Sequence, residues 1–359
     1  MSNSHETILS VDLEALEHNY DYLKSKLNPG TEIIAVVKAF AYGHGDIVIA
    51  KKLESLGVKA FWVADFEEGI KLRESGINSQ IIIANPGSKS YSIITKYNLQ
   101  PVIYNFRLLD LYGGKGNTIS VHIKFNSGMN RYGFHLNEIR MLAKKLKEYP
   151  NLIIQSICTH LSSSNESSND EFTRSQLLRF ETITSSFYTK TQIKTKKHIL
   201  NTAGLLRFPD SQAEMVRLGI GLYGIGQDKN LKPIAKLQSH IVQILNLNEG
   251  DKVGYYGAFI ANKKMRIGII PIGYADGINR KLGNENGWVT VNKKHAKIIG
   301  EISMDSMIID LTIIDANEGD IVTIFDAENN VSNIAKNLKT IPYEVLATLN
   351  RRIKRVYSQ

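Results

Sequence analysis

Eight short runs of β-branched and apolar residues, separated by helical patterns, occupy the first two thirds of this 359-residue chain. This alternation is typical of a parallel sheet built from strand–helix units. Eight such units predict an α/β fold with a closed (β/α)8 barrel of the TIM type. The predicted strands are residues 33–38, 60–64, 80–84, 101–104, 120–125, 153–160, 198–200 and 215–219.

Amphipathic helical patterns lie between these runs, at residues 46–56, 66–75, 138–149 and 171–186. A further helical pattern at 13–27 precedes the first predicted strand. We expect this helix to pack beside the last strand, in the place of a missing eighth helix.

The pattern changes after about Leu231. Apolar runs at 236–247, 265–271, 288–291, 303–312 and 320–325 follow one another with Gly, Asn and Asp turns between them. Such spacing predicts a mostly antiparallel β domain, which ends in two short helical patterns at 331–338 and 343–349. We therefore expect a barrel over residues 1–231 and a C-terminal β domain over residues 232–359.

The formal charge of +9 raises the question of nucleic-acid binding, but the basic residues are dispersed. Lys144, Lys145 and Lys147 belong to an amphipathic helical pattern, while residues 194–197 form a polar connector. Solvated faces explain such residues better than a phosphate-binding surface. The first nineteen residues lack the charged start and apolar stretch of a signal peptide, no segment predicts a membrane span, and Cys158 is the sole cysteine. We expect a cytoplasmic protein without nucleic-acid or membrane partners.

Polar and charged residues stand where the predicted barrel strands end. The carboxyl ends of barrel strands carry the active site in this fold. For any single position a solvated loop group is the better explanation, but several such residues occur together. They are Lys38, Lys124 with Arg131 beyond it, His160, Asn201 with Thr202, and Arg217.

Lys38 is the sharpest of these candidates, because it ends an apolar strand in the segment AVVKAFAYGHG. Burying a charged amine is costly. A desolvated lysine with a lowered pKa can instead form an imine with an aldehyde cofactor. A lysine that extends to the barrel rim explains the residue equally well.

A glycine-rich segment, RLGIGLYGIG at 217–226, closes the eighth predicted strand. Loops after the seventh and eighth strands commonly hold phosphate in barrel enzymes, and glycine lets backbone N–H groups approach an anion closely. Repeated glycine also marks ordinary turns. Together with Lys38, the segment points to a phosphate-bearing aldehyde, namely pyridoxal 5'-phosphate.

Nine sequence blocks in order resemble the alanine racemases, a family of fold-type III pyridoxal-phosphate enzymes, over almost the whole chain. The blocks are AVVKAFAYGHG at 35–45, VHIKFNSGMNRYGF at 121–134, CTHLSSS at 158–164, NTAG at 201–204, MVRLGIGLYGIG at 215–226, DKVGYYGAF at 251–259, IPIGYADGINR at 270–280, IGEISMDSMIIDLT at 299–312 and PYEVLATLNRRIKRVY at 342–357. The family fold is a barrel followed by a β domain, as predicted above.

The resemblance implies a two-base racemisation of L- and D-alanine that supplies D-alanine for peptidoglycan. Lys38 would carry the cofactor and serve the D-enantiomer, and Tyr255 would serve the L-enantiomer from the partner subunit of a homodimer. Acid/base groups on both faces of Cα make each direction direct. The resemblance also implies cofactor contacts from Tyr42, His160, Asn201, Thr202, Arg217, Gly219, Ile220 and Tyr343.

Further residues take roles by the same resemblance. Arg131 would contact the substrate carboxylate, assisted by the backbone of Met304 from the other subunit, and Tyr274 and Asp305 would line the entry and the subunit interface. Lys124 would carry an N-carbamate that holds Arg131, although an ordinary lysine is the simpler interpretation. His160 would link Arg217 to the partner's Tyr255. Without the resemblance, the simpler interpretation of His160 is a strand-end histidine whose hydrogen bonds are satisfied within the protein. No metal ligand is implied.

Four positions depart from the family pattern. Phe40 replaces a usual Asn, Asn126 a usual Asp, Tyr256 a small residue, and Glu301 an arginine at the entry. We expect Glu301 to make the entry less positive and Asn126 to remove a charge near Lys124.

The alternatives to alanine racemisation are a serine or broad-specificity amino-acid racemase and a non-catalytic pyridoxal-phosphate carrier. A carrier would be a single barrel, and it would leave the β domain and Tyr255 without a role.

Overall fold

The computed structural model describes residues 4–358, which form two compact units. The barrel unit comprises Asn19–Ala39 and Asp46–Leu222. The β unit comprises the described residues up to His18, the segment Phe40–Gly45 and the chain from Tyr223 onward.

Eight parallel strands close the barrel in chain order, as the sequence predicts. Most of their residues are buried, because barrel strands are covered on both faces. The strands are β2 (Glu32–Val36), β3 (Ala60–Val63), β4 (Gln80–Ile83), β5 (Gln100–Ile103), β6 (Ile119–Lys124), β7 (Leu152–Cys158), β8 (Lys196–His198) and β9 (Met215–Leu218).

Helices follow the strands and bury one face against the barrel. They are α3 (Asp46–Ser55), α4 (Phe66–Glu74), α5 (Tyr91–Lys96), α6 (Phe106–Gly113), α7 (Ile139–Glu148), α8 (Asp170–Thr191) and α9 (Thr202–Arg207), with short helices η1 (Leu136–Glu138), η2 (Ser167–Asn169) and η3 (Pro209–Ser211). Helix α1 (Leu13–Lys24) contacts the segment after β9, where Asn19 donates to the Leu222 carbonyl at 3.1 Å. That this helix takes the place of a missing eighth helix stays a prediction.

The β unit contains a mainly antiparallel nine-stranded sheet with the order β11-β14-β17-β16-β15-β18-β10-β1-β19. Its strands are β1 (Ile8–Asp12), β10 (Ala235–His240), β11 (Gln243–Leu247), β14 (Met265–Ile270), β15 (Trp288–Val291), β16 (Lys294–Ile299), β17 (Met307–Asp310), β18 (Ile321–Phe325) and β19 (Lys354–Ser358). A small second sheet pairs β12 (Lys252–Val253) with β13 (Phe259–Ile260). The remaining elements are η4 (Tyr255–Gly257), η5 (Tyr274–Asp276), η6 (Arg280–Leu282), α10 (Val331–Asn337) and α11 (Pro342–Ala347).

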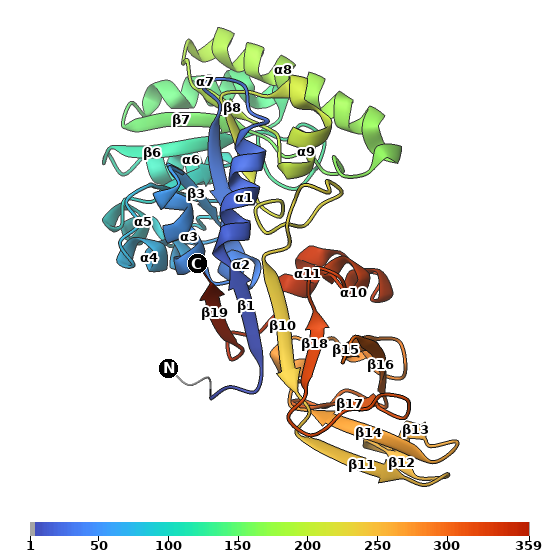
Figure 1. Cartoon of the computed structure of the whole chain (residues 1–359). Coiled ribbons are helices and arrows are strands. Elements are labelled where there is room, and N and C mark those ends of the chain that lie inside the picture. Colours follow the sequence, from blue (N-terminus) through green and yellow to red (C-terminus); the bar gives the residue numbers. More distant parts are fainter. Residues whose placement is uncertain (1–3, 359) are drawn as a thin grey trace. The chain divides into compact units, whose positions relative to one another are not determined.

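The N-terminal strand does not follow the expected division at residue 231. Strand β1 lies between β10 and β19 (Figure 1) and pairs with both, so it belongs to the β sheet. The parallel β1–β19 pairing joins Ile8 to Lys354, and no local pattern signals a contact of that sequence separation. The expected ranges also include residues 1–3 and 359, which lie outside the described residues.

Two smaller differences concern strands of the β domain. The expected run 236–247 divides into β10 and β11, and the run 303–312 shortens to β17. Among residues 4–358, no helix has the length and apolarity needed to cross a membrane, and no group of three or more His, Cys, Asp or Glu side chains is placed to bind a metal ion.

Candidate active site

Lys38 stands two residues after β2, at the carboxyl end of the barrel strands. Its pKa is lowered, first by burial and then by the positive charge of Arg131, with Arg217 acting in the same direction. The carboxylate of Glu68 opposes these effects. A larger share of the amine is therefore neutral than in an exposed lysine, and a neutral amine is the nucleophilic form.

Glu68 fixes the backbone just beyond two neighbouring strands, β2 and β3. Its carboxylate accepts hydrogen bonds from the N–H groups of Ala39 and Ala64, each at 2.7 Å. Burial raises the pKa of Glu68, while these two hydrogen bonds lower it. The sequence analysis missed this residue, because an acidic residue in the first turn of α4 is also an ordinary helix-start feature.

The segment Lys38–Tyr42 forms a helical turn, α2, with left-handed backbone. The φ angles of Ala39, Phe40, Ala41 and Tyr42 are 53°, 58°, 51° and 52°. A left-handed turn of non-glycine residues costs roughly 1–2 kcal/mol per residue. Strain of this kind persists where surrounding contacts fix the backbone, and it clusters at functional sites.

Replacing Ala39 with glycine should stabilise the protein by about 1 kcal/mol, because glycine adopts positive φ without the clash of a Cβ atom. Ala39 is exposed, so little packing is lost. The measurement is chemical unfolding of the variant. Ala347→Gly, in the exposed part of helix α11, is the matched control and should lose about 0.5–1 kcal/mol. Equal losses in both variants would contradict the left-handed turn.

Residues near the C-terminus hold the second half of this turn. The Phe40 ring contacts two guanidinium groups, with Arg351 at 4.7 Å and Arg355 at 5.2 Å from the ring centre. Arg355 also donates to the Gly43 carbonyl at 3.1 Å, and the Tyr357 hydroxyl donates to the His44 carbonyl at 3.0 Å. Phe40, one of the departures noted above, therefore adds cation–π contacts to this part of the turn.

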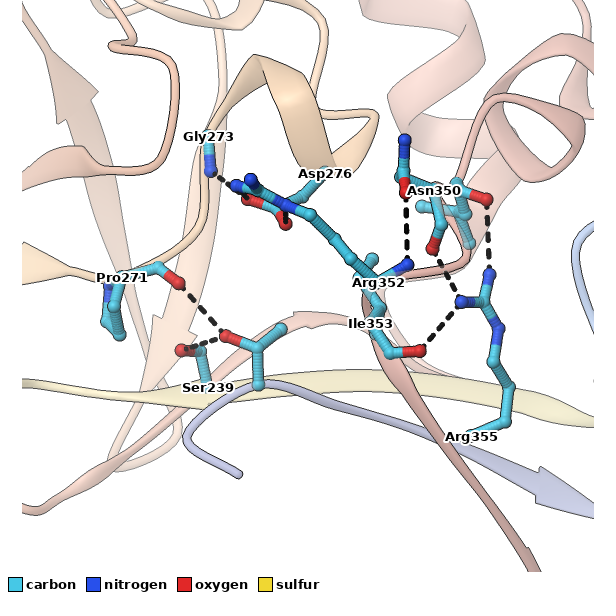
Figure 2. Close-up of polar contacts among 10 residues, drawn as sticks. Ser239, Pro271, Gly273, Asp276, Asn350, Arg352, Ile353 and Arg355 are labelled. Carbon is cyan, nitrogen blue, oxygen red and sulfur yellow. Dashed lines mark hydrogen bonds and ion pairs between the residues drawn. The ribbon is translucent and has the colours of Figure 1, made fainter. Parts of the chain in front are cut away.

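Arg355 is itself held by the chain around it, as Figure 2 shows. Its guanidinium donates to the carbonyls of Asn350 and Ile353 at 2.5 and 2.7 Å, and to that of Leu349 at 3.1 Å.

Lys124, at the end of β6, is a second buried amine in the barrel unit. Burial lowers the pKa of Lys124 to about 8, and Arg217, Arg131 and Lys38 contribute in the same direction. Its Nζ lies 5.7 Å from the centre of the Tyr132 ring, and the Arg131 guanidinium lies 5.9 Å from the same ring. Three other cationic side chains predicted from the sequence thus act on Lys124, and two of them, Arg131 and Arg217, also act on Lys38.

Arg217, on β9, is buried and held by several acceptors. Its Nη1 donates to His198 Nδ1 at 2.5 Å and to the His198 carbonyl at 3.1 Å. Its Nη2 donates to the carbonyls of Thr159 and Ile199 at 2.6 and 3.1 Å, and to His160 Nδ1 at 3.1 Å. The expected pairing of Arg217 with His160 is present in the structure.

The hydrogen bond from Arg217 determines which nitrogen of His160 carries the proton. A guanidinium has no acceptor, so His160 Nδ1 accepts and Nε2 bears the hydrogen. Burial, with the nearby cations, lowers the pKa of His160 well below its usual value, so the ring is neutral. The Nε2–H group is therefore a hydrogen-bond donor.

The glycine-rich segment after β9 approaches the start of α9. The Thr202 hydroxyl accepts from the N–H groups of Gly219 and Gly221 at 3.3 and 3.4 Å, both long for hydrogen bonds. A Cβ atom on Gly221 would lie 2.3 Å from the Thr202 methyl group, so this position requires glycine. Ile220, between Gly219 and Gly221, is buried. Asn201 caps α9 by accepting a hydrogen bond from the Gly204 N–H at 2.8 Å.

Two tyrosines predicted to bind the cofactor meet in the β unit. The rings of Tyr42 and Tyr343 lie 5.7 Å apart, and Tyr42 is also 4.9 Å from Tyr223. Burial raises the pKa of Tyr42, and Tyr343 adds to the effect. Both hydroxyls thus remain protonated and can donate hydrogen bonds near neutral pH.

Tyr274, Met304 and Asp305 lie together in the β unit. The N–H of Tyr274 donates to the Ser303 carbonyl at 3.0 Å, and a Cβ on Gly273 would approach both Met304 and Asp305. Figure 2 shows how Asp276 fixes this turn: its carboxylate accepts from the Gly273 N–H at 2.8 Å and from Arg352 Nε at 2.5 Å. The predicted entry residues are therefore brought together.

Tyr255 lies on η4, an exposed turn between β12 and β13. Its side chain is 63% exposed and that of Tyr256 is 97% exposed. Tyr256 has a φ of 60°, so the two neighbouring tyrosines differ in backbone conformation.

The structure also accounts for the departures at Asn126 and Glu301. Asn126 Oδ1 accepts from the N–H groups of Gly128 and Asn130, so it stabilises a loop. Glu301 accepts from Arg280 at 2.5 Å and from Asn284 at 3.0 Å. The Arg280 charge compensates the Glu301 carboxylate, which reduces the loss of positive charge that we expected there.

Several polar residues inside the barrel were not predicted as part of the site. His198 accepts a hydrogen bond from Arg217, and the Trp62 ring lies 5.5 Å from the Arg217 guanidinium. Ser156 is within hydrogen-bond distance of both His198 and His122. The signal was available, because polar residues within barrel strands are unusual.

Comparison with known proteins places the chain in a family. Residues 11–227 match the family model of the alanine racemase N-terminal domain, and residues 234–357 match that of the C-terminal domain. The chain belongs to the alanine racemase family. "Alanine racemase 1" of Caldanaerobacter subterraneus subsp. tengcongensis is 33% identical, over 98% of this chain and 94% of that protein.

Solved alanine racemases share the fold. The enzyme from Bartonella henselae, described with covalently bound pyridoxal phosphate, has a TM-score of 0.90 at 29% identity, with 99% of this chain and 100% of that chain covered. The enzyme from Bacillus anthracis, described with bound L-Ala-P, has a TM-score of 0.92 at 26% identity, with 100% and 96% covered. The match spans both units of the racemase fold, so a single-barrel carrier is excluded as the architecture.

Proposed function

We propose that this protein is a pyridoxal-phosphate-dependent alanine racemase that interconverts L- and D-alanine with Lys38 and Tyr255 as its two bases. The observation that carries the proposal is Lys38: a largely buried amine of lowered pKa just beyond a barrel strand, with Arg131 and Arg217 as cationic neighbours. Membership in the racemase family supports the same activity.

The residues present fit this cofactor. The neutral fraction of Lys38 suits attachment to an aldehyde, and the positive charges of Lys124, Arg131 and Arg217 suit an anionic ligand. For the phosphate we assign the backbone of Gly219 and Ile220 and the hydroxyls of Tyr42, Thr202 and Tyr343, with Asn201 holding the start of α9. The weak contacts between Thr202 and the glycine N–H groups are readily exchanged for stronger ones to an anion.

Pyridoxal phosphate, when bound, joins the substrate amino group through its aldehyde and withdraws electrons so that the Cα proton becomes acidic. The Lys38 amine takes or returns that proton on one face of Cα. Arg131 binds the substrate carboxylate, assisted by the backbone of the partner's Met304, and this contact orients Cα toward the two bases.

Arg217 and His160 tune the site. A guanidinium placed at the pyridine nitrogen of the cofactor disfavours protonation of that nitrogen, because Arg217 has only donors. This limits electron withdrawal and so limits side reactions. The neutral His160 would offer its Nε2–H to the hydroxyl oxygen of the partner's Tyr255 and so orient that hydroxyl.

The second base comes from a second copy of the chain. Tyr255 stands on an exposed turn, as a residue donated to a neighbouring subunit should. We propose a homodimer in which each active site uses Lys38 of one protomer and Tyr255 of its partner, with Tyr274 and Asp305 at the entry. Activity that persists in a dilute, purely monomeric sample would contradict this assembly.

Lys124 is proposed to carry an N-carbamate formed from its neutral amine and CO2, with release of one proton. Its lowered pKa, about 8, makes the neutral amine available near pH 8. The modified group is an anion and can hold Arg131. We expect protein-bound carbamate by 13C NMR with labelled bicarbonate, and its absence in Lys124→Met. Lys71→Met, on the exposed face of α4, should leave the signal unchanged; a signal that survives Lys124→Met would refute this assignment.

The substrate proposal is tested with a panel of L-amino acids in a chiral product assay, with and without added cofactor. We expect L-alanine to give D-alanine faster than L-serine or L-lysine gives its enantiomer, since Tyr343 and the partner's Tyr255, if placed as in the family, would crowd the methyl side of the substrate. Faster turnover of serine would favour the alternative, a serine or broad-specificity racemase. We further propose that the enzyme works in the cytoplasm and supplies D-alanine for peptidoglycan.

A further inference from the structure

A chain of buried polar side chains crosses the barrel interior, with one residue on each of five consecutive strands. Gln100 on β5, His122 on β6, Ser156 on β7, His198 on β8 and Arg217 on β9 make up this buried polar chain. Barrel interiors are ordinarily filled by bulky apolar residues. Four of the five are nearly inaccessible to solvent, so their polar groups need partners within the protein.

Each neighbouring pair in the buried polar chain is within hydrogen-bond distance. Gln100 Oε1 lies 2.9 Å from His122 Nε2, and His122 Nδ1 lies 2.7 Å from the Ser156 hydroxyl. That hydroxyl lies 2.8 Å from His198 Nε2, and His198 Nδ1 lies 2.5 Å from Arg217 Nη1. The contacts are therefore continuous from Gln100 to Arg217.

Arg217 at one end and the Gln100 amide oxygen at the other set the hydrogen-bond directions in this chain, because a guanidinium only donates and an amide oxygen only accepts. His198 Nδ1 must accept, so its proton sits on Nε2 and is donated to the Ser156 oxygen. The Ser156 hydroxyl then donates to His122 Nδ1. His122 in turn carries its proton on Nε2 and donates it to the Gln100 amide oxygen. One arrangement satisfies all four contacts, with both histidines neutral.

The surroundings favour neutral rings. Burial lowers the pKa of His122 to about 3 and that of His198 well below its usual value. The Trp62 ring meets His198 edge to face at 5.8 Å and also lies beside the Arg217 guanidinium. His198 thus has little freedom to rotate away from Arg217.

We propose that Ser156 and His122, with Gln100 behind them, are positioning residues that hold His198 in its Nε2–H tautomer and thereby fix the Arg217 guanidinium. The opposite tautomer would set a His198 N–H against an Arg217 N–H. Because two donors would then face each other, the Arg217 guanidinium would move away from His198. The inference rests on the proposed function for its catalytic consequence, since Arg217 is the group assigned to the cofactor ring nitrogen.

That consequence is control of a side reaction. Displacement of Arg217 would remove the group that keeps the ring nitrogen of the bound cofactor unprotonated. The chemistry then open to the holoenzyme would be transamination, in which water is consumed, alanine leaves as pyruvate and the cofactor keeps the amino group as pyridoxamine phosphate. The amino acid would be oxidised and the cofactor reduced, so no external oxidant would be needed.

The first test reads the tautomers directly, by 15N NMR of the histidine-labelled chain prepared without cofactor. Signals are assigned by single substitutions of the nine histidines. We expect His198 and His122 to be neutral at pH 7 with the proton on Nε2. A charged ring, or a proton on His198 Nδ1, would overturn the proposal even if the protein racemises alanine. Absence of racemisation with the expected tautomers would instead defeat the proposed function.

The second test uses the holoenzyme of Ser156→Ala, which removes the acceptor of the His198 Nε2–H. We expect pyruvate formed per racemisation event to rise at least fivefold, and Ser156→Thr, which keeps a hydroxyl, to restore the low ratio. Ser239→Ala removes an equally buried hydroxyl from the β sheet, and we expect it to leave the ratio unchanged. An unchanged ratio in a folded Ser156→Ala protein would refute the proposal.

A second variant covers the case in which Ser156→Ala fails to fold. Gln100→Leu acts at the far end of the buried polar chain, where the side chain is partly accessible, and it leaves the His122 Nε2–H without its acceptor. We expect a smaller rise, about twofold, in pyruvate per racemisation event. A ratio equal to that of the wild type would overturn the proposal.

Discussion

Lys38→Ala is expected to lose alanine racemisation by on the order of 10⁴-fold or more, because one amine both holds the cofactor and moves the Cα proton. The variant should also lose the absorbance band of lysine-bound cofactor. The measurement combines a chiral assay with absorbance spectra of protein reconstituted with pyridoxal phosphate.

Lys71→Ala is the matched control, since Lys71 is an exposed lysine of α4 in the same unit. It should keep both the band and the activity. Full racemisation by a verified Lys38→Ala protein would eliminate the proposed mechanism, including every role assigned relative to Lys38.

Tyr255→Phe is expected to lower net racemisation by about 10²–10⁴-fold, the usual contribution of a positioned acid/base group. Removal of the Cα proton should be slowed for only one of the two enantiomers. By the proposed division, Tyr255 takes the Cα proton of L-alanine and Lys38 takes that of D-alanine. Deuterium exchange at Cα should therefore fall for L-alanine and persist for D-alanine.

Tyr256→Phe is a close control, because it makes the same chemical change at the neighbouring position, whose side chain is almost completely exposed. It should leave both exchange rates near those of the unaltered enzyme. Equal loss of exchange for the two enantiomers in Tyr255→Phe would contradict the assignment of one base to each face. Unchanged exchange rates for both enantiomers in Tyr255→Phe would mean that another residue is the second base.

The site was predictable to the extent that its residues mark strand ends. Lys38, Lys124, His160 and Arg217 stand at or near the ends of apolar runs, and the structure makes them electrostatic neighbours. Glu68 was not predicted, because its contacts with the N–H groups of Ala39 and Ala64 depend on how α4 packs against two strand ends.

The sequence also predicted most of the helices and strands, but not every partner. The eight barrel strands were predicted from runs of apolar residues, which depend on local composition. Strand β1 was missed, because a five-residue strand with partners in β10 and β19 has no local signature. The left-handed turn after Lys38 was missed for a related reason: non-glycine residues do not favour positive φ, so contacts from Arg355 and Tyr357 are needed to hold it.

By itself the sequence determined the barrel, the following β domain, the lysine that ends the first barrel strand and the glycine-rich segment after the last. Each of these depends on residues that are neighbours along the chain. Only the tertiary structure decided the protonation pattern of the buried histidines, because that pattern starts from Arg217, on β9, and passes through His198 and Ser156 on two other strands. Hydrogen-bond direction is a property of groups in contact, and folding alone brings these groups together.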